Sequence, residues 1–182
     1  MAQAAAIRTA VPADTGDLGR LGAALVRQHH EFDAQRFLAP GPDVESGYGR
    51  FLVSQIDAAD SVVLVAERAA RIVGYAYAAI EPRSWKDLRD AAGWIHDVVV
   101  VEGERRRGTG RALVEAAARW MEDRGAPRVI LSTAARNEDA QAAFSALGFR
   151  RTMIEMTRER QGPLPATSMA EARGRGRRPA GD

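Results

Sequence analysis

A single stretch, residues 94–118, places the strongest constraint on what this chain can fold into. It contains a β-branched run from Val98 to Val101, then three consecutive arginines, then Gly108-Thr109-Gly110 and a helical pattern. This order predicts a strand, a glycine-rich turn and the N-terminus of a helix. The unpaired N–H groups of a helix start attract anions, and glycine lets a phosphate approach the main chain closely. We therefore expect a polyphosphate-bearing cofactor at residues 105–111.

Hydrophobic periodicity and turn residues divide the remaining chain into short elements. Strands are expected at 4–10, 61–67, 71–80, 94–101, 128–133 and 149–158, and helices at about 12–28, 43–56, 108–124 and 137–148. Asp14 or Thr15 is expected to cap the first helix, Asp43 the second and Asn137 the last. The strands 61–67 and 71–80 should pair as an antiparallel hairpin. The predicted order is β-α-α-β-β-β-α-β-α-β.

Composition bounds the class of protein. The chain has 182 residues, of which 46% are hydrophobic, and this is enough for one globular domain with a real core. No window reaches the roughly 18 apolar residues of a membrane span, and residues 2–6 do not resemble a signal peptide. The absence of cysteine excludes disulfides, thiolate metal sites and a cysteine nucleophile, and it fits a cytoplasmic protein.

The location of charge matters more than its net value of +2. Residues 159–182 hold five arginines against three acidic residues, which gives +2 and leaves the remainder neutral. Nucleic-acid binding by the core is therefore not favoured. The segment is rich in Pro, Gly, Arg and Ala without periodicity, so we expect a folded domain at 1–158 and a disordered basic tail at 159–182.

Two common phosphate motifs fail on detail. There is no Gly-Lys-Ser/Thr of a P-loop, and Leu113 replaces the third glycine of the dinucleotide fingerprint. What is present is Arg-x-x-Gly-x-Gly at 105–110 after a valine-rich strand, followed by Asn137-x-x-Ala140 and Leu147-Gly148-Phe149. With the hairpin ending at 72–76, this combination resembles the GNAT superfamily of acetyl-CoA-dependent N-acetyltransferases, over roughly residues 7–158.

The resemblance implies an α/β (α+β) fold with a mixed, mostly antiparallel central sheet and about four flanking helices. It also implies acetyl-CoA as co-substrate and no metal. The main chain of Val98 and Val100 would pair with the pantetheine arm, the amides of 106–111 would hold the pyrophosphate, and Asn137 would touch the cofactor from the last helix. The full set of expected cofactor residues is Val98, Val99, Val100, Arg105, Arg106, Arg107, Gly108, Thr109, Gly110, Arg111, Asn137 and Phe144. At least one of the arginines should only solvate the helix start.

Amine acetylation needs a general base, since an amine with a pKa near 10.4 costs about 4.6 kcal/mol to deprotonate at pH 7. His96 and Asp97 occupy the position at which some polyamine acetyltransferases of this superfamily carry a Glu-Asp pair. We favour His96 as the base with Asp97 in support, the alternative being a packed histidine and a structural aspartate. Adjacent strand residues point to opposite faces, so only one should line the cleft unless a bulge re-aims them.

The general acid for the leaving thiolate is missing from the pattern. Many members of the superfamily place a tyrosine where this chain has Phe144. The loss is tolerable, because a thiol with a pKa near 8.5 leaves as thiolate at pH 7 against only about 2 kcal/mol. Ser132, Ser145 or a water molecule could donate the proton instead.

The expected acceptor is a primary amine of a small molecule or a protein, bound near 29–48 and 81–92. Acidic residues in these segments would suit a cationic amine: Glu31, Asp33, Asp43, Glu45, Glu81 and Asp87. His29 and His30 lack the spacing of a helical zinc site. The hypothesis is direct transfer in a ternary complex, with a homodimer as one possible assembly. Because of Phe144, a catalytically weak acyl-CoA-binding or regulatory domain is the alternative, and a nucleic-acid-associated protein is a weaker third.

Overall fold

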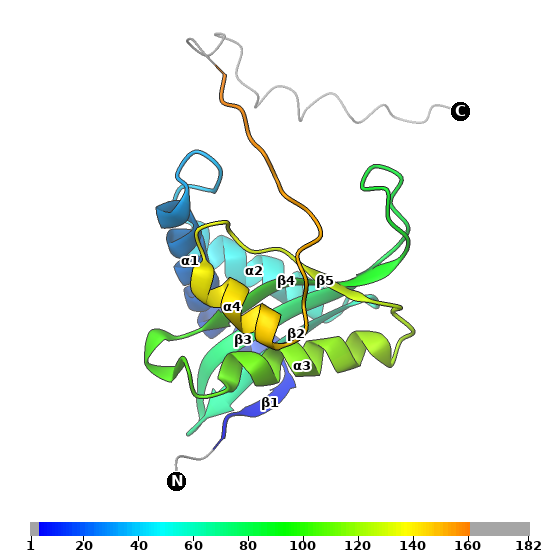
Figure 1. The fold of residues 1–182 in the computed structure, drawn as a ribbon. Coiled ribbons are helices and arrows are strands. Elements are labelled where there is room, and N and C mark those ends of the chain that lie inside the picture. The colour runs from blue at the N-terminus through cyan, green and yellow to red at the C-terminus, as the bar shows by residue number, and fades with distance from the viewer. Residues whose placement is uncertain (1–3, 161–182) are drawn as a thin grey trace, which may run out of the picture. The chain divides into compact units, whose positions relative to one another are not determined.

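One five-stranded sheet organises the molecule. The computed structural model describes residues 4–160, and the chain divides into two units, Met1–Arg151 and Thr152–Asp182. The strands are β1 (Ala6–Thr9), β2 (Ser61–Arg68), β3 (Arg71–Glu81), β4 (Ala92–Val100) and β5 (Val129–Leu131). They lie in the order β1-β2-β3-β4-β5, and all neighbours pair antiparallel except β4 and β5, which are parallel (Figure 1).

The predicted hairpin of β2 and β3 is confirmed. Its turn consists of Ala69 and Ala70, which both have positive φ (49° and 57°). Two consecutive left-handed residues match the right-handed twist of the flanking strands, which is why this geometry serves two-residue hairpins even without glycine. The hairpin places β3 in the middle of the sheet, beside the strand expected to carry the chemistry.

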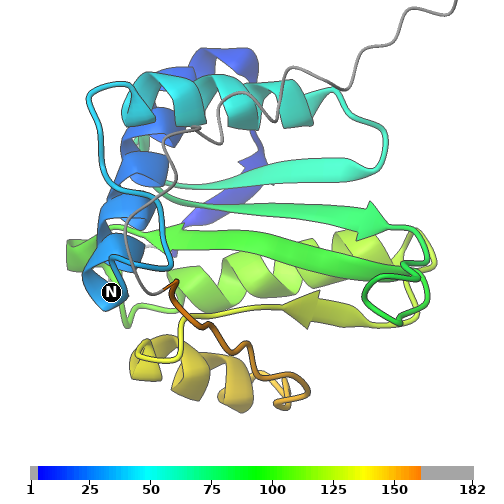
Figure 2. The same cartoon turned by 90° about the horizontal axis from the view of Figure 1, so that it is seen from above.

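Helices cover both faces of the sheet (Figure 2). α1 (Thr15–Phe32) and α2 (Val44–Ile56) pack on one face, where they enclose Val63, Val65 and Tyr75. α3 (Thr109–Glu122) packs on the other, against Val62 and Leu64, and α4 (Glu138–Ala146) adds Phe144 there. Strict alternation along β2 sends neighbouring valines to opposite faces, so each face has its own hydrophobic core.

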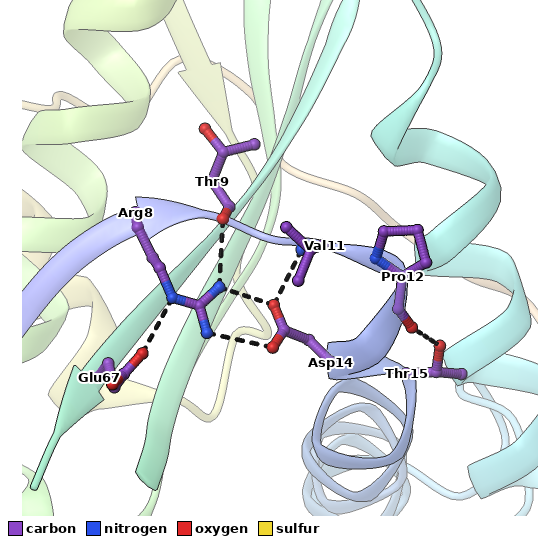
Figure 3. A network of polar contacts seen from close by, with 7 residues as sticks. All are labelled: Arg8, Thr9, Val11, Pro12, Asp14, Thr15 and Glu67. Atoms are coloured by element: carbon purple, nitrogen blue, oxygen red, sulfur yellow. Dashed lines mark hydrogen bonds and ion pairs between the residues drawn. The ribbon is translucent and has the colours of Figure 1, made fainter. Parts of the chain in front are cut away.

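Asp14 joins the first strand to the first helix in an unexpected way. It occupies the N-cap position of α1 but makes no capping hydrogen bond. Its carboxylate instead accepts from the Val11 N–H at 2.9 Å and from both terminal nitrogens of Arg8, at 2.8 and 3.1 Å (Figure 3). The Arg8 guanidinium also reaches Glu67 on β2 at 2.9 Å. Arg8 lowers the pKa of Asp14, and the network fixes where α1 leaves the sheet.

The expected strand at 149–158 is wrong. Gly148, with φ of 87°, ends α4, and the Phe149 N–H turns back to the Phe144 carbonyl at 3.1 Å. Residues 150–160 form neither helix nor strand, and Met153 and Ile154 are 85% and 86% exposed. A strand forms where one face is buried, and the apolar side chains here bury nothing. The observed order therefore ends on α4.

The predicted fold class is nevertheless confirmed: a mixed sheet, mostly antiparallel, flanked by four α-helices in the part of the chain described. Between residues 4 and 160, no helix combines the length and the apolar character needed to cross a bilayer. Most of the predicted basic tail, residues 161–182, lies outside the described residues.

Candidate active site

The sheet opens between β4 and β5. Their pairing covers only Gly93–Ile95 against Val129–Leu131, so the second half of β4 has no neighbour on that side within residues 4–160. The Val101 N–H donates to the Val73 carbonyl of β3 at 2.9 Å. By alternation, the main-chain groups of Val98 and Val100 point the other way, into the gap. This is the unpaired edge that the expected pantetheine contact requires.

Past β4, a row of main-chain donors is left without acceptors. The chain runs through a short turn, Glu102–Glu104, to Gly108, which precedes α3 with φ of 82°. In the described structure, the N–H groups of residues 106–111 donate to no protein atom, and the first paired amide is that of Ala112, which donates to Gly108. Six free donors at a helix N-terminus form an anion cradle.

The arginines around this cradle differ in their partners. Arg107 pairs with Glu104 at 3.3 Å and Arg111 with Glu115 at 3.0 Å. Arg105 donates to the Val100 carbonyl at 3.1 Å, so it occupies one acceptor on the open edge of β4. Arg106, with φ of 59°, has no polar partner among residues 4–160. Arg106 is therefore the arginine whose charge is available to an incoming anion.

A cleft of about 260 Å³ lies beside the open edge of β4. One wall, here named the helix-pair wall, consists of Leu25, Val26, Gln28, His29, Phe37, Leu38 and Tyr48 from α1, α2 and their connection. The opposite wall consists of Leu131, Ser132, Thr133, Asn137, Ala140 and Phe144, and the floor is Ile95–Val98. Arg136 ties the two walls together, since its guanidinium donates to the Phe32 carbonyl at 2.9 Å. The cleft thus unites His96, Asp97, Val98, Asn137 and Phe144.

A β-bulge places both His96 and Asp97 in this cleft. The register passes from Tyr77↔Asp97 to Ala78↔Ile95, so His96 is one extra residue on β4. A bulged residue interrupts the strict alternation of side chains. His96 stacks on Tyr77, with ring centroids 4.8 Å apart, and Asp97 bonds to Tyr75; both tyrosines belong to the α1–α2 face. The sequence predicts only one of the two side chains in the cleft unless a bulge re-aims them, and that bulge occurs.

His96 is held by its neighbours yet remains accessible. Its side chain is 31% exposed, its ring stacks on Tyr77, and Nε2 lies 3.3 Å from Oε1 of Glu81. Burial lowers the pKa of His96 below its usual 6.5, although Glu81 and Asp97 oppose this. The imidazole is therefore neutral at pH 7, which is the state that can accept a proton.

Asp97 is partly buried and bound by two hydroxyls. Tyr48 of α2 and Tyr75 of β3 both donate to Oδ2, at 2.7 and 3.0 Å. Burial raises the pKa of Asp97, and the two hydroxyls and His96 counteract it. Burial and the neighbouring carboxylate also raise the pKa of Tyr48, which keeps its hydroxyl protonated as a donor. The sequence prediction did not identify either tyrosine.

A glycine sets the position of Tyr48. A Cβ on Gly22 of α1 would lie 2.2 Å from the Tyr48 ring, so only glycine lets this ring lie against α1. Tyr75 and Tyr77, two residues apart on β3, share one face. The sequence contains one signal for these contacts, namely two tyrosines two residues apart on the strand before His96. Which residues of β4 they contact follows only from the antiparallel register of β3 and β4.

Several smaller predictions also have outcomes. Asn137 caps α4, because its side-chain oxygen accepts from the Ala140 N–H at 3.2 Å. Of the residues suggested to donate a proton to the thiolate, Ser132 lines the cleft, whereas Ser145 is exposed and does not.

None of the six acidic residues expected around the acceptor lines the cleft; Glu81 instead contacts Arg89 and His96. No cluster of three or more metal-ligating side chains occurs among the described residues.

Comparison with known proteins identifies the family. Residues 26–149, more than half of the chain, match the model of the acetyltransferase (GNAT) family. The chain belongs to this family. It is also 34% identical over 112 residues to mycothiol acetyltransferase from Cellulomonas flavigena, which corresponds to 59% of this chain and 31% of that protein. The matched region thus spans less than a third of the length of that relative.

Solved structures share the fold at low identity. A mutant of the BH1408 protein from Bacillus halodurans superposes with a TM-score of 0.72 at 22% identity, over 88% of this chain and 99% of that one. The aminoglycoside N-acetyltransferase AAC(6')-Iy, in complex with CoA, gives a TM-score of 0.65 at 18% identity, over 87% and 95%. These similarities confirm the fold predicted from the sequence.

Proposed function

We propose that this chain transfers an acetyl group from acetyl-CoA to a primary amine of a small molecule or protein, by direct transfer in a ternary complex. Membership of the acetyltransferase (GNAT) family supports acetyl transfer, and the donor, the acceptor and the mechanism belong to the proposal. The observation that carries it is the row of six unpaired main-chain N–H groups at 106–111, directly after the strand that floors the cleft. A cofactor with a pyrophosphate matches those donors.

The residues present fit coenzyme A. The cradle at 106–111 would take the pyrophosphate, with Arg106 supplying a free positive charge. Val98 and the N–H of Val100 would pair with the pantetheine arm along the unpaired edge of β4. Asn137 and Phe144 would contact it from the opposite wall. The CoA complex of a protein with the same fold supports this assignment, and the bound cofactor would supply an activated acetyl thioester.

Different side chains of the cleft would carry out the proton transfers of the reaction. His96, neutral at pH 7, would take a proton from the acceptor ammonium, and the freed nitrogen lone pair then forms the new C–N bond as the C–S bond breaks. The second proton leaves the nitrogen as the amide forms and passes through Ser132 or water to the departing thiolate, so that neither relay is left deprotonated. Phe144 cannot donate, and the cost of releasing a thiolate near pH 7 is only about 2 kcal/mol.

The activities of the relatives bear on the acceptor. One is a mycothiol acetyltransferase and another an aminoglycoside N-acetyltransferase, so small-molecule amines are the first class to test. The match over residues 26–149 supports a catalytic domain within 1–158, and the lack of cysteine supports a cytoplasmic location. A homodimer remains a prediction.

The test is turnover of acetyl-CoA with a panel of amines. Thiol release is followed with arylalkylamines, polyamines, aminoglycosides and peptide N-termini, and the acetylated product is identified by mass. We expect acetyl-CoA-dependent acetylation of at least one amine class. Phe144 favours one competing candidate, a catalytically weak acyl-CoA-binding domain. That candidate gains if acetyl-CoA binds in calorimetry and no amine turns over.

A further inference from the structure

The floor of the cleft presents one carboxylate oxygen without a donor. Tyr48 and Tyr75 both donate to Oδ2 of Asp97, at 2.7 and 3.0 Å. No hydrogen bond from residues 4–160 reaches Oδ1, although Asp97 lines the cleft. A partly buried carboxylate is costly unless a cation or donor meets it. The two tyrosines therefore hold Asp97 in a fixed orientation with one oxygen free for a ligand.

The surroundings of this oxygen are largely apolar. Leu25 and Val26 from α1, Phe37 and Leu38 from the α1–α2 connection and the ring of Tyr48 form most of the helix-pair wall. Leu38 is 75% exposed, so its apolar surface is open to a ligand. The Phe37 ring is fixed edge-on against His29, with centroids 4.9 Å apart. A small apolar group would bury surface on this wall at about 25 cal/mol per Å².

A second ammonium group would find no partner there. Among the described residues that line the cleft, Asp97 is the only carboxylate, and the other ionisable groups are His29, His96 and the Tyr48 hydroxyl. Nearby acids are engaged elsewhere: Glu81 contacts Arg89 and His96, and Asp33 accepts the N–H of Gln35 at 3.0 Å. Further charges of a polycation would be desolvated against an apolar wall without compensation.

We infer that the acceptor carries one ammonium group on an apolar body, as an arylalkylamine does, and that Oδ1 of Asp97 holds this ammonium next to His96. The inference rests on the proposed function and names its acceptor class. It also assigns separate tasks to adjacent residues: Asp97 binds the cation, and His96 removes its proton. The bulge on β4 makes this division possible, because it places both side chains on one face of the sheet.

Binding without turnover tests this first. N,N-dimethylphenethylamine is protonated near pH 7, keeps one N–H donor and cannot form a stable amide. Its Kd for the full chain is measured by calorimetry with CoA present. Asp97→Asn should weaken it about tenfold, because the charge is lost while an oxygen remains for the tyrosines. The Kd of the neutral phenethyl alcohol should change less than about twofold. Asp90→Asn is the matched control, since Asp90 pairs with Arg83 outside the cleft.

A second variant examines the apolar body. Phe37→Ala should raise the Michaelis constant for phenethylamine about tenfold and leave that for methylamine unchanged, because only the larger amine reaches the ring. With the unaltered protein, kcat/KM for phenethylamine should exceed those for spermidine and neamine at least about a hundredfold.

The outcomes separate the two proposals. Equal binding of the tertiary ammonium by the Asp97→Asn and Asp90→Asn variants overturns the inference, and so does faster acetylation of spermidine or neamine than of phenethylamine. If no amine turns over but the tertiary ammonium binds and depends on Asp97, the proposed acetyl transfer fails while recognition of a single cation stands.

Discussion

Two regions, one in the middle of β4 and one just beyond its C-terminal end, prepare the molecule for a reaction in different ways. The cradle at 106–111 uses main-chain N–H groups from one continuous segment. The cluster around His96 and Asp97 uses side chains from β3, β4 and α2, brought together by a bulge and by the register of the sheet. The first needs a particular backbone path, whereas the second needs a particular packing. Substitutions should therefore damage them in different ways.

Removing the imidazole should give the largest effect. His96→Ala is expected to lower kcat about 10²- to 10⁴-fold, the usual contribution of a positioned general base. The Kd of acetyl-CoA, measured by calorimetry, should stay unchanged, because the cradle is built from other residues. Equal turnover by the variant would remove His96 as the base and leave Asp97 or water in that role.

The pH dependence should reveal the same group. The pKa of His96 lies below 6.5, so kcat/KM should be level above that pH and fall about tenfold per unit once the imidazole is protonated. The free energy of unfolding should also decrease as the pH falls. Below pH 6.5 the unfolded chain takes up this proton before the folded one, so protonation favours unfolding. Glu81, Asp97, His29, Arg89 and Tyr77 face the group from its surroundings. An acidic limb that persists in His96→Ala would contradict the assignment.

A pair of matched tyrosine variants measures how much the packing around Asp97 contributes. Tyr75→Phe removes one of two donors to a partly buried carboxylate, and we expect it to reduce the free energy of unfolding by about 2 kcal/mol. Tyr77→Phe, two residues along the same strand, removes a hydroxyl that donates to neutral Gln55 at 3.1 Å, and should cost about 1 kcal/mol. Urea denaturation compares them, and equal losses would mean that Asp97 gains nothing special from Tyr75.

A pair of glycine variants tests the backbone path of the cradle. Gly108 and Gly103 both have open space where an added Cβ would lie, but only Gly108 has positive φ, at 82°. Gly108→Ala should lower the free energy of unfolding by about 1 kcal/mol and weaken the binding of acetyl-CoA, because the amides are redirected. Gly103→Ala should change neither. Comparable acetyl-CoA affinity in both variants would show that the cradle does not depend on this conformation.

The cradle could be predicted almost completely, because its features are local. A valine-rich strand, a glycine turn and the arginines from Arg105 to Arg111 are contiguous in the chain, and helix-start physics acts within one turn. The expected final strand failed for the opposite reason. A strand needs a partner and a buried face, and apolar residues such as Met153 and Ile154 do not specify either.

The sequence by itself determined the family, the order of the elements up to α4, and the glycine-rich turn that leaves the N–H groups of 106–111 unpaired. Only the tertiary structure decided that His96 and Asp97 share one face, that Tyr48 and Tyr75 hold Asp97, and that the six acidic residues expected around the acceptor do not line the cleft. The physical reason is the separation along the chain of the residues that interact. Turn and helix-start chemistry depends on neighbours in the chain, whereas the Tyr48–Asp97 hydrogen bond joins residues 49 positions apart and exists only once α2 lies on the sheet.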